Sequence, residues 1–125
     1  MAVFKIKRGD TLPVMTGTLT VESSGAAYSL AQAATVTMLA VRYVDSSGGS
    51  IAEETARSRT CTISSPSSGG IVTYTFLTTD WGSDDATKFV AGTYKVEYQV
   101  TFNSGAILTF PTDSYEEMLI WGDLD

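Results

Sequence analysis

Residues 93–102 read TYKVEYQVTF, and this stretch decides the fold. Five large apolar side chains alternate with polar ones along it, namely Tyr94, Val96, Tyr98, Val100 and Phe102. Because successive side chains of a β-strand point to opposite faces, a period of two places all five on one face. The stretch therefore predicts a half-buried antiparallel strand.

The residues after this strand predict a hairpin and a final strand. Asn103-Ser104-Gly105 forms a short loop whose glycine can adopt the left-handed conformation that such hairpins require. Residues 106–110 should therefore pair with 93–102. Pro111 cannot donate to a β-ladder, so it should end that second strand, and residues 115–121 should form the last one.

Shorter alternating runs predict further strands earlier in the chain, at residues 4–7, 18–22, 35–44, 59–63 and 72–76. Val72, Tyr74 and Phe76 should share the interior with the inward side chains of 93–102. Residues 35–44 carry apolar side chains on both faces, which indicates a bulge near Met38 or a central strand covered on both sides. Residues 78–89 do not alternate, and we expect a crossover loop with a short helical turn capped by Thr79.

Seven or eight short strands at this spacing predict an all-β protein, an immunoglobulin-like antiparallel β-sandwich. The length of 125 residues suits a single domain over residues 1–125. Hydrophobic residues make up 43% of the chain and charged residues 18%, which is typical of a globular protein.

The charge is negative and unevenly distributed. The net charge is −6, so phosphate backbones and anionic lipids are poor partners, and we expect binding to neither nucleic acid nor membrane. The first 60 residues hold 6 basic and 5 acidic side chains, whereas the remainder holds 2 and 9. This asymmetry fits either simple solubility or contact between unlike surfaces.

The residue types that most enzymes need are missing or scarce. Without histidine, the chain has neither a Ser-His-Asp triad nor an imidazole zinc site, so we expect no enzymatic activity and no cofactor. The lone Cys61 cannot form an internal disulfide and should be a buried thiol. Glu116 and Glu117 are adjacent on a strand and should point to opposite faces.

Two weaker binding hypotheses remain open. Asp80, Asp84 and Asp85 could supply oxygen ligands to calcium, but their spacing does not match a calcium loop, and a solvated loop is the better interpretation. Tyr28, Trp81 and Trp121 could form a platform that stacks on sugars, although such aromatics are more often core or interface residues.

Two segments together carry a resemblance to a known family. Residues 4–13 read FKIKRGDTLP, and residues 92–113 read GTYKVEYQVTFNSGAILTFPTD. With Ala34-Thr35-Val36-Thr37-Met38 between them, the chain resembles the N-terminal domain family of phage baseplate upper proteins over residues 4–121. Members of that family commonly continue into long helices, which this sequence does not contain.

The resemblance implies a structural component of a bacteriophage virion, in the tail, baseplate or neck, that joins other virion proteins within a symmetric homo-oligomer. The N-terminus shows no apolar signal segment, which fits assembly in the bacterial cytoplasm and a final location in the virion. The alternative function is a host-surface or glycan-binding adhesion module.

Eight residues are the candidates for an assembly interface: Lys5, Lys7, Arg8, Trp81, Asp84, Asp85, Leu119 and Trp121. The basic group near the N-terminus should meet acids of a neighbouring copy, such as Asp84, Asp85, Glu116 and Glu117. Trp81, Leu119 and Trp121 should be exposed apolar anchors. The alternative is that both tryptophans simply close the ends of the sandwich.

Overall fold

The computed structural model describes residues 3–20, 24–45, 47–52, 54–82, 87–110 and 116–122. Strands dominate it, and the only helical elements in these ranges are two single 3₁₀ turns. In chain order the elements are β1 (Val3–Lys7), β2 (Met15–Thr18), β3 (Ala33–Val44), β4 (Arg57–Ile63), η1 (Ser67–Gly69), β5 (Ile71–Tyr74), η2 (Thr78–Asp80), β6 (Gly92–Phe102), β7 (Ile107–Phe110) and β8 (Glu116–Trp121). No helix in the described ranges is long and apolar enough to cross a membrane.

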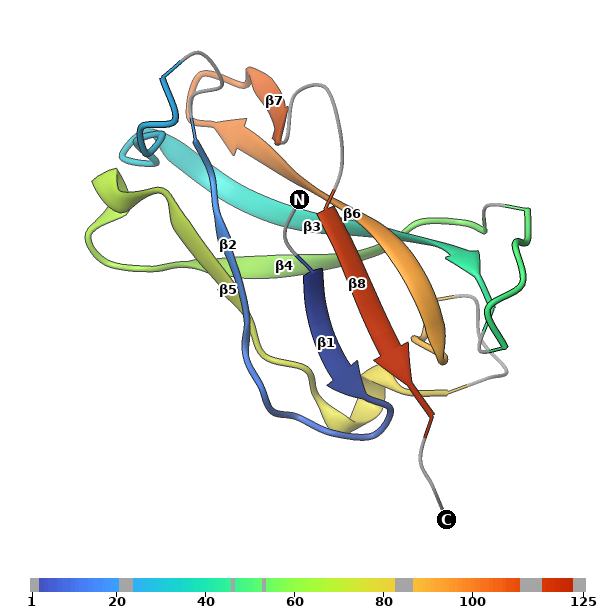
Figure 1. Ribbon diagram of the computed structural model, residues 1–125. Helices are drawn as coiled ribbons and strands as arrows, with labels where there is room; N and C mark the ends of the chain where they lie inside the picture. The colour runs from blue at the N-terminus through green and yellow to red at the C-terminus, as the bar shows by residue number, and fades with distance from the viewer. Residues whose placement is uncertain are drawn as a thin grey trace.

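The strands form a two-layered sandwich, and β4 passes from one layer to the other (Figure 1). The hydrogen-bonded order is β1-β8-β6-β3-β4-β5-β2, with β7 attached to β6. Residues 57–61 of β4 pair with β3, whereas Thr62 and Ile63 pair with β5, so β4 belongs to both layers. The prediction of an all-β sandwich with seven or eight strands is confirmed.

One strand pair differs from the expected antiparallel pattern. β1 and β8 run parallel, with Phe4 beside Met118 and Ile6 beside Ile120. This register brings the apolar side chains of both strands to one face, where Ile6, Met118 and Ile120 are all buried. The other six strand pairs of the described residues are antiparallel, as predicted for the sandwich.

β6 provides the middle of the core, as its alternation predicts. Tyr94, Val96, Tyr98 and Val100 are buried, whereas Phe102 at the strand end is only partly buried. Val72 and Phe76 join them from the other layer, and Tyr74 packs at its margin. The Cys61 thiol is also buried, which raises its pKa to about 11.

Of the two alternatives for residues 35–44, the bulge near Met38 is wrong and the central strand is confirmed. Val36, Met38 and Ala40 are fully buried and pair without interruption with both β4 and β6. The register shifts lie at the two ends of β3 instead, between Ala33 and Thr35 and between Arg42 and Val44. β3 is therefore a central strand whose outward side chains are half-buried.

The second strand begins earlier than the sequence suggested. The expected strand at residues 18–22 is replaced by β2, in which Met15 and Gly17 point inward, followed by the buried Leu19. Val21 and Glu22 lie outside the described residues. Gly17 lies directly against the Tyr98 ring, so β2 packs face to face on β6.

Of the remaining local predictions, the β6–β7 hairpin is confirmed and two others are wrong in detail. The β6–β7 hairpin forms with Gly105 at φ +91°, as predicted. The Thr79 cap is wrong, because the Asp80 carboxylate accepts the Leu77 backbone N–H at 2.8 Å at the start of η2. β4 starts two residues earlier than expected, at Arg57.

Candidate functional site

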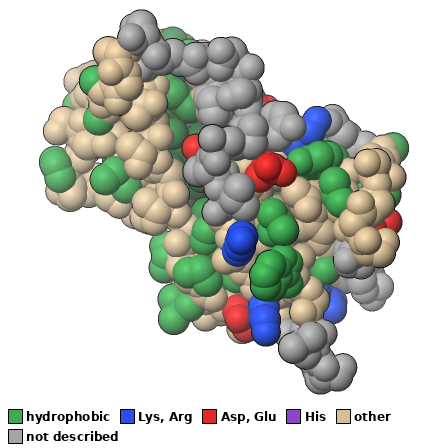
Figure 2. Space-filling view, in the orientation of Figure 1, with side chains coloured by type: hydrophobic (Ala, Val, Ile, Leu, Met, Phe, Trp, Pro, Cys, Tyr) green, Lys and Arg blue, Asp and Glu red, His purple; other side chains and the backbone are tan. Residues whose placement is uncertain are grey.

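The outward side chains of β1 and β8 form the strongest candidate site. In the parallel register Lys5 lies beside Leu119 and Lys7 beside Trp121. Neighbouring partners in a sheet share a face, so these four side chains lie together on the side away from the core. We call them the Trp121 face. Figure 2 views this side, where hydrophobic and basic side chains lie next to one another over β1 and β8.

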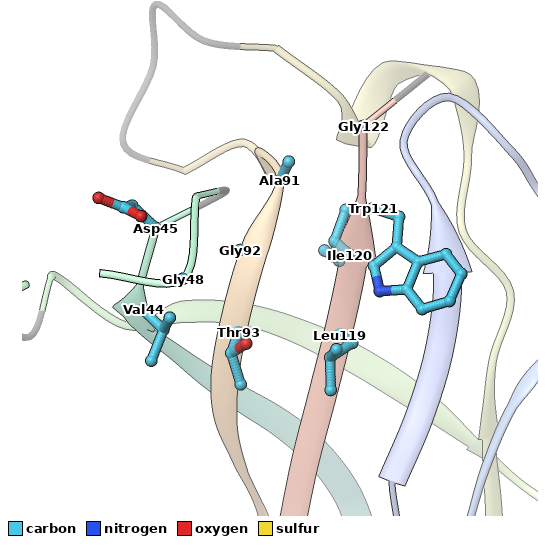
Figure 3. Close-up of a pocket in the computed structure, with 10 residues that line it drawn as sticks. All are labelled: Val44, Asp45, Gly48, Ala91, Gly92, Thr93, Leu119, Ile120, Trp121 and Gly122. Atoms are coloured by element: carbon cyan, nitrogen blue, oxygen red, sulfur yellow. The ribbon is translucent and has the colours of Figure 1, made fainter. Parts of the chain in front are cut away.

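Trp121 is the most conspicuous residue of this face. Its side chain is 51% exposed, although it ends a strand whose other face is buried. Figure 3 shows the indole extending from β8 toward the neighbouring β1 strand. The Lys5 ammonium lies over the indole at 5.9 Å from the ring centroid, which is a cation–π distance.

Arg8 joins the basic end of the face through the backbone. Its N–H donates to the Trp121 carbonyl at 2.7 Å, which extends the β1–β8 ladder by one bond. Lys5 and Lys7 are exposed and Arg8 is partly buried. Lys5 and Lys7 therefore lie on the Trp121 face, whereas Arg8 joins it through its backbone alone.

Next to the Trp121 face, the outer side chains of β6 and β3 are already engaged with one another. The Tyr43 hydroxyl donates to the Glu117 carboxylate at 2.8 Å, and the Lys95 ammonium lies 5.0 Å from the Tyr43 ring centroid. Glu117 also stands opposite Lys95 in the β6–β8 register. These side chains already have partners within the domain, whereas the indole is exposed.

A small groove of about 250 Å³ opens beside Trp121 (Figure 3). It is lined by Val44, Asp45, Gly48, Ala91, Gly92, Thr93, Leu119, Ile120, Trp121 and Gly122. Gly92 has φ +149°, and a Cβ there would lie 2.4 Å from the Val44 carbonyl oxygen. No larger residue fits at this position, so glycine keeps β6 close to β3 and shapes the groove.

Asp45 lies at the rim of the groove but is occupied locally. Its carboxylate accepts hydrogen bonds from the Ser47 hydroxyl at 2.7 Å and from the Ser47 and Gly49 backbone N–H groups. The Ser47 hydroxyl is the main cause that lowers the Asp45 pKa. In Figure 3 this carboxylate points away from Trp121, so it shapes the turn rather than the groove.

The remaining predicted interface residues are less exposed than Trp121 or fall outside the described residues. Trp81 is only partly exposed: its ring stacks on Phe76 at 5.2 Å and its Nε1 donates to the Asp10 carbonyl at 3.2 Å. Leu119 is half-buried within the Trp121 face. Asp84 and Asp85 lie outside the described residues. Trp81 therefore closes one end of the sandwich, whereas Trp121 does not.

The acids proposed to meet a neighbour's basic group are differently placed. Glu116 and Glu117 point to opposite faces, as predicted, because Glu117 lies on the outer face with Tyr43 while Glu116 lies on the inner one. Burial raises the Glu116 pKa above its ordinary value. Glu116 is thus poorly placed for a contact on the outer face.

Asp80 does not lie in a solvated loop, contrary to the favoured interpretation. It is 5% exposed, and its carboxylate accepts from Arg59 Nε at 2.8 Å and from the Tyr74 hydroxyl at 2.6 Å. These donors compensate the cost of burying the charge. Among the described residues, no cluster of three or more Cys, Asp or Glu side chains could hold a metal ion.

Sequence analysis missed the inward-pointing arginines of β4. Arg57 is 4% exposed and pairs with Glu54 at 2.8 Å, and Glu54 also accepts from Arg42 at 2.9 Å. Burial raises the Glu54 pKa, but the two arginines outweigh that effect and hold it below its ordinary value. The signal was present, because Arg57 and Arg59 share the period-two face of Cys61.

The three aromatics considered as a sugar platform do not lie together. Tyr28 packs against Phe102 and Phe110, at the C-terminal end of β6. Trp121 lies at the other end, since Gly92 pairs with its neighbour Ile120. Ten residues of strand separate these positions, which corresponds to about 33 Å.

Comparison with known proteins shows a structural likeness to one solved protein. No family model and no curated protein matches the chain. Among solved structures, it is similar to CopC from Methylosinus trichosporium OB3b, with a TM-score of 0.40 and 12% identity over 100% of this chain and 89% of that one.

Proposed function

We propose that this chain is a structural component of a bacteriophage virion that joins other virion proteins through the Trp121 face. The observation that carries the proposal is the 51% exposure of Trp121 on the outer face of β1 and β8. Large aromatic side chains that stay exposed on a well-packed domain are the usual anchors of protein interfaces.

The surroundings of Trp121 favour a protein partner with an acidic surface. Lys5 and Lys7 are exposed on the same face as the indole and carry two positive charges on a chain whose net charge is −6. Such a local reversal of charge orients an approaching partner and excludes wrong ones. The partner can be another copy of this chain, within a symmetric assembly, or a different virion protein.

The resemblance to the baseplate upper protein family gives the proposal its biological setting. Gly105 and the β6–β7 hairpin, which carry part of that resemblance, act as scaffold and leave the Trp121 face free. We therefore place the chain in the virion, on the tail, baseplate or neck, after assembly in the bacterial cytoplasm.

Incorporation into particles tests the proposal. Trp121→Ser removes the exposed indole, and Leu12→Ser is a matched control because Leu12 is 67% exposed but lies in the loop between β1 and β2. Both variants should fold, as checked by circular dichroism and thermal unfolding. We expect Trp121→Ser to lower the amount in purified particles by at least about 10-fold, which corresponds to about 1.4 kcal/mol.

Two results would contradict the proposal. If the wild-type protein is absent from purified particles, the virion assignment is wrong. If folded Trp121→Ser protein is incorporated as well as the Leu12→Ser control, the chain is attached through another surface.

A further inference from the structure

A second, larger groove lies at the other end of β6, away from the Trp121 face. It encloses about 540 Å³ between the segment before β3 and the turn that joins β6 to β7. Figure 1 shows these two segments together at the end of the sandwich that carries β7. The backbone N–H of Asn103 donates to the Gln32 carbonyl at 2.9 Å, which ties the two walls together.

Two aromatic rings form the apolar part of this groove. The Tyr28 and Phe102 ring centroids lie 6.2 Å apart with their planes tilted by 47°, and both side chains are partly exposed. The buried Phe110 meets the Tyr28 ring edge-on at 5.0 Å. Phe110 therefore holds Tyr28 from the core side, and the tyrosine ring enters the groove as a fixed surface.

Uncharged hydrogen-bonding groups surround the two rings. The side-chain amides of Gln32 and Asn103 are exposed and make no hydrogen bond within the described part of the chain. The Ser29 and Ser104 hydroxyls accept the backbone N–H groups of Ala31 and Ala106, each at 3.4 Å, and each keeps a hydrogen to donate. Each amide can both donate and accept.

The absence of charged side chains among the described residues that line the groove disfavours charged ligands. Every described side chain that lines it is neutral. A chain with a net charge of −6 also repels anions at long range. A ligand held here must therefore present apolar faces to the rings and many neutral donors and acceptors to the amides and hydroxyls.

We propose that this groove binds a neutral oligosaccharide. The C–H face of a pyranose ring matches an aromatic surface, while its hydroxyls match groups that both donate and accept. The site is independent of the Trp121 face, since about 33 Å of strand separates them. A chain anchored through the Trp121 face would hold this groove at the far end of the sandwich.

Titration with defined sugars tests the proposal. The probes are four neutral hexasaccharides, namely maltohexaose, cellohexaose, laminarihexaose and chitohexaose in its N-acetylated form, with hexagalacturonate as the anionic comparison. Backbone amide resonances of the ¹⁵N-labelled protein report the binding site. We expect at least one neutral hexasaccharide to shift the signals of Gln32 and Asn103 with a dissociation constant on the order of 1 mM.

Variants separate this groove from other surfaces. Gln32→Ala combined with Asn103→Ala removes two exposed amides without touching the core, and should weaken binding at least about 10-fold. Tyr28→Ala should abolish it, whereas Trp121→Ser should leave it unchanged.

Three outcomes would overturn the assignment. The first is the absence of saturable shifts with all four neutral sugars. The second is binding that survives the double amide variant, and the third is equal affinity for hexagalacturonate. None of these outcomes affects incorporation into particles, so the two proposals fail independently.

Discussion

At the scale of single residues, Gly17 shows how the opposite layer of the sandwich restricts the residue type at a position. A Cβ at this position would lie 2.6 Å from Tyr98 Cζ, and Tyr98 is 2% exposed with no room to move away. Glycine is therefore required by close approach and not by a turn, because Gly17 lies inside β2. The sequence alone could not reveal this, since the contact joins residues far apart in the chain.

Gly17→Ala should destabilise the fold by about 1–3 kcal/mol, the range typical of overpacked cores. Urea unfolding measures the free energy of unfolding directly. Gly69→Ala is the control, because a Cβ at Gly69 meets nothing within 4 Å. Equal midpoints for the two variants would show that the β2 and β6 layers are not packed as closely as described.

Asp80 is the residue whose charge matters most to the fold. Burial raises its pKa, but hydrogen bonds from the Leu77 N–H, Tyr74 and Arg59 outweigh burial and lower the pKa below the ordinary value. A lowered pKa in the folded state adds stability that is present above the unfolded pKa of about 4. That stability is lost as the pH falls through the folded pKa.

Asp80→Asn should therefore lose about 2 kcal/mol at pH 7, since it removes the carboxylate that pairs with the Arg59 charge. Its stability should also change less with acid than that of the wild type. Thermal unfolding between pH 7 and pH 3 measures both effects, with Glu97→Gln as a control that removes a carboxylate with no ion pair in the described residues. Parallel pH profiles for Asp80→Asn and the wild type would contradict the role of this group.

At the scale of elements, β6 is the strand on which the sandwich is built. It pairs with β3 along one edge over nearly its full length. Its other edge is divided, since residues 92–96 pair with β8 and residues 98–101 with β7. One strand thus joins both ends of the molecule, and the Trp121 face and the neutral groove lie at its opposite ends.

Val96→Ala should cost about 2 kcal/mol, because it removes two buried methyl groups and leaves a small cavity. Glu97→Ala on the neighbouring, half-buried position should cost clearly less. Chemical denaturation of the two variants compares them on one strand. Similar losses would contradict the placement of Val96 on the inner face and Glu97 on the outer face of β6.

Alternation made β6 and its hairpin with β7 predictable from the sequence. It could not give the partners of each strand, because pairing depends on contacts between distant residues. The sequence therefore predicts Lys5 and Trp121 separately as interface residues, but it does not predict the contact between them. The burial of Arg57 and Asp80 could not be predicted for another reason. Charged side chains are expected at the surface unless their ion-pair partners are known.

At the scale of the whole molecule, the two candidate sites have different characters. The Trp121 face combines an exposed indole with basic side chains, whereas the groove at the far end is neutral. Charge is therefore unevenly distributed over the surface of the domain as well as along the sequence. A domain with two unlike ends is suited to linking one component to another.

The parallel pairing of β1 with β8 has a mechanical consequence. A load applied between Val3 and Trp121 would pull the two strands along each other, because the start of one and the end of the other lie at opposite ends of the pair. Their ladder bonds run across the strands, so shear would load all of them together instead of one at a time.

Stretched in an optical trap by handles at Val3 and Gly122, the domain should resist more force than when the handles are placed at Gly92 and Gly122. Those two residues flank the end of the antiparallel β6–β8 pair, where bonds would open in sequence. A domain built in this way would withstand more tension along β1 and β8 than across the end of the β6–β8 pair.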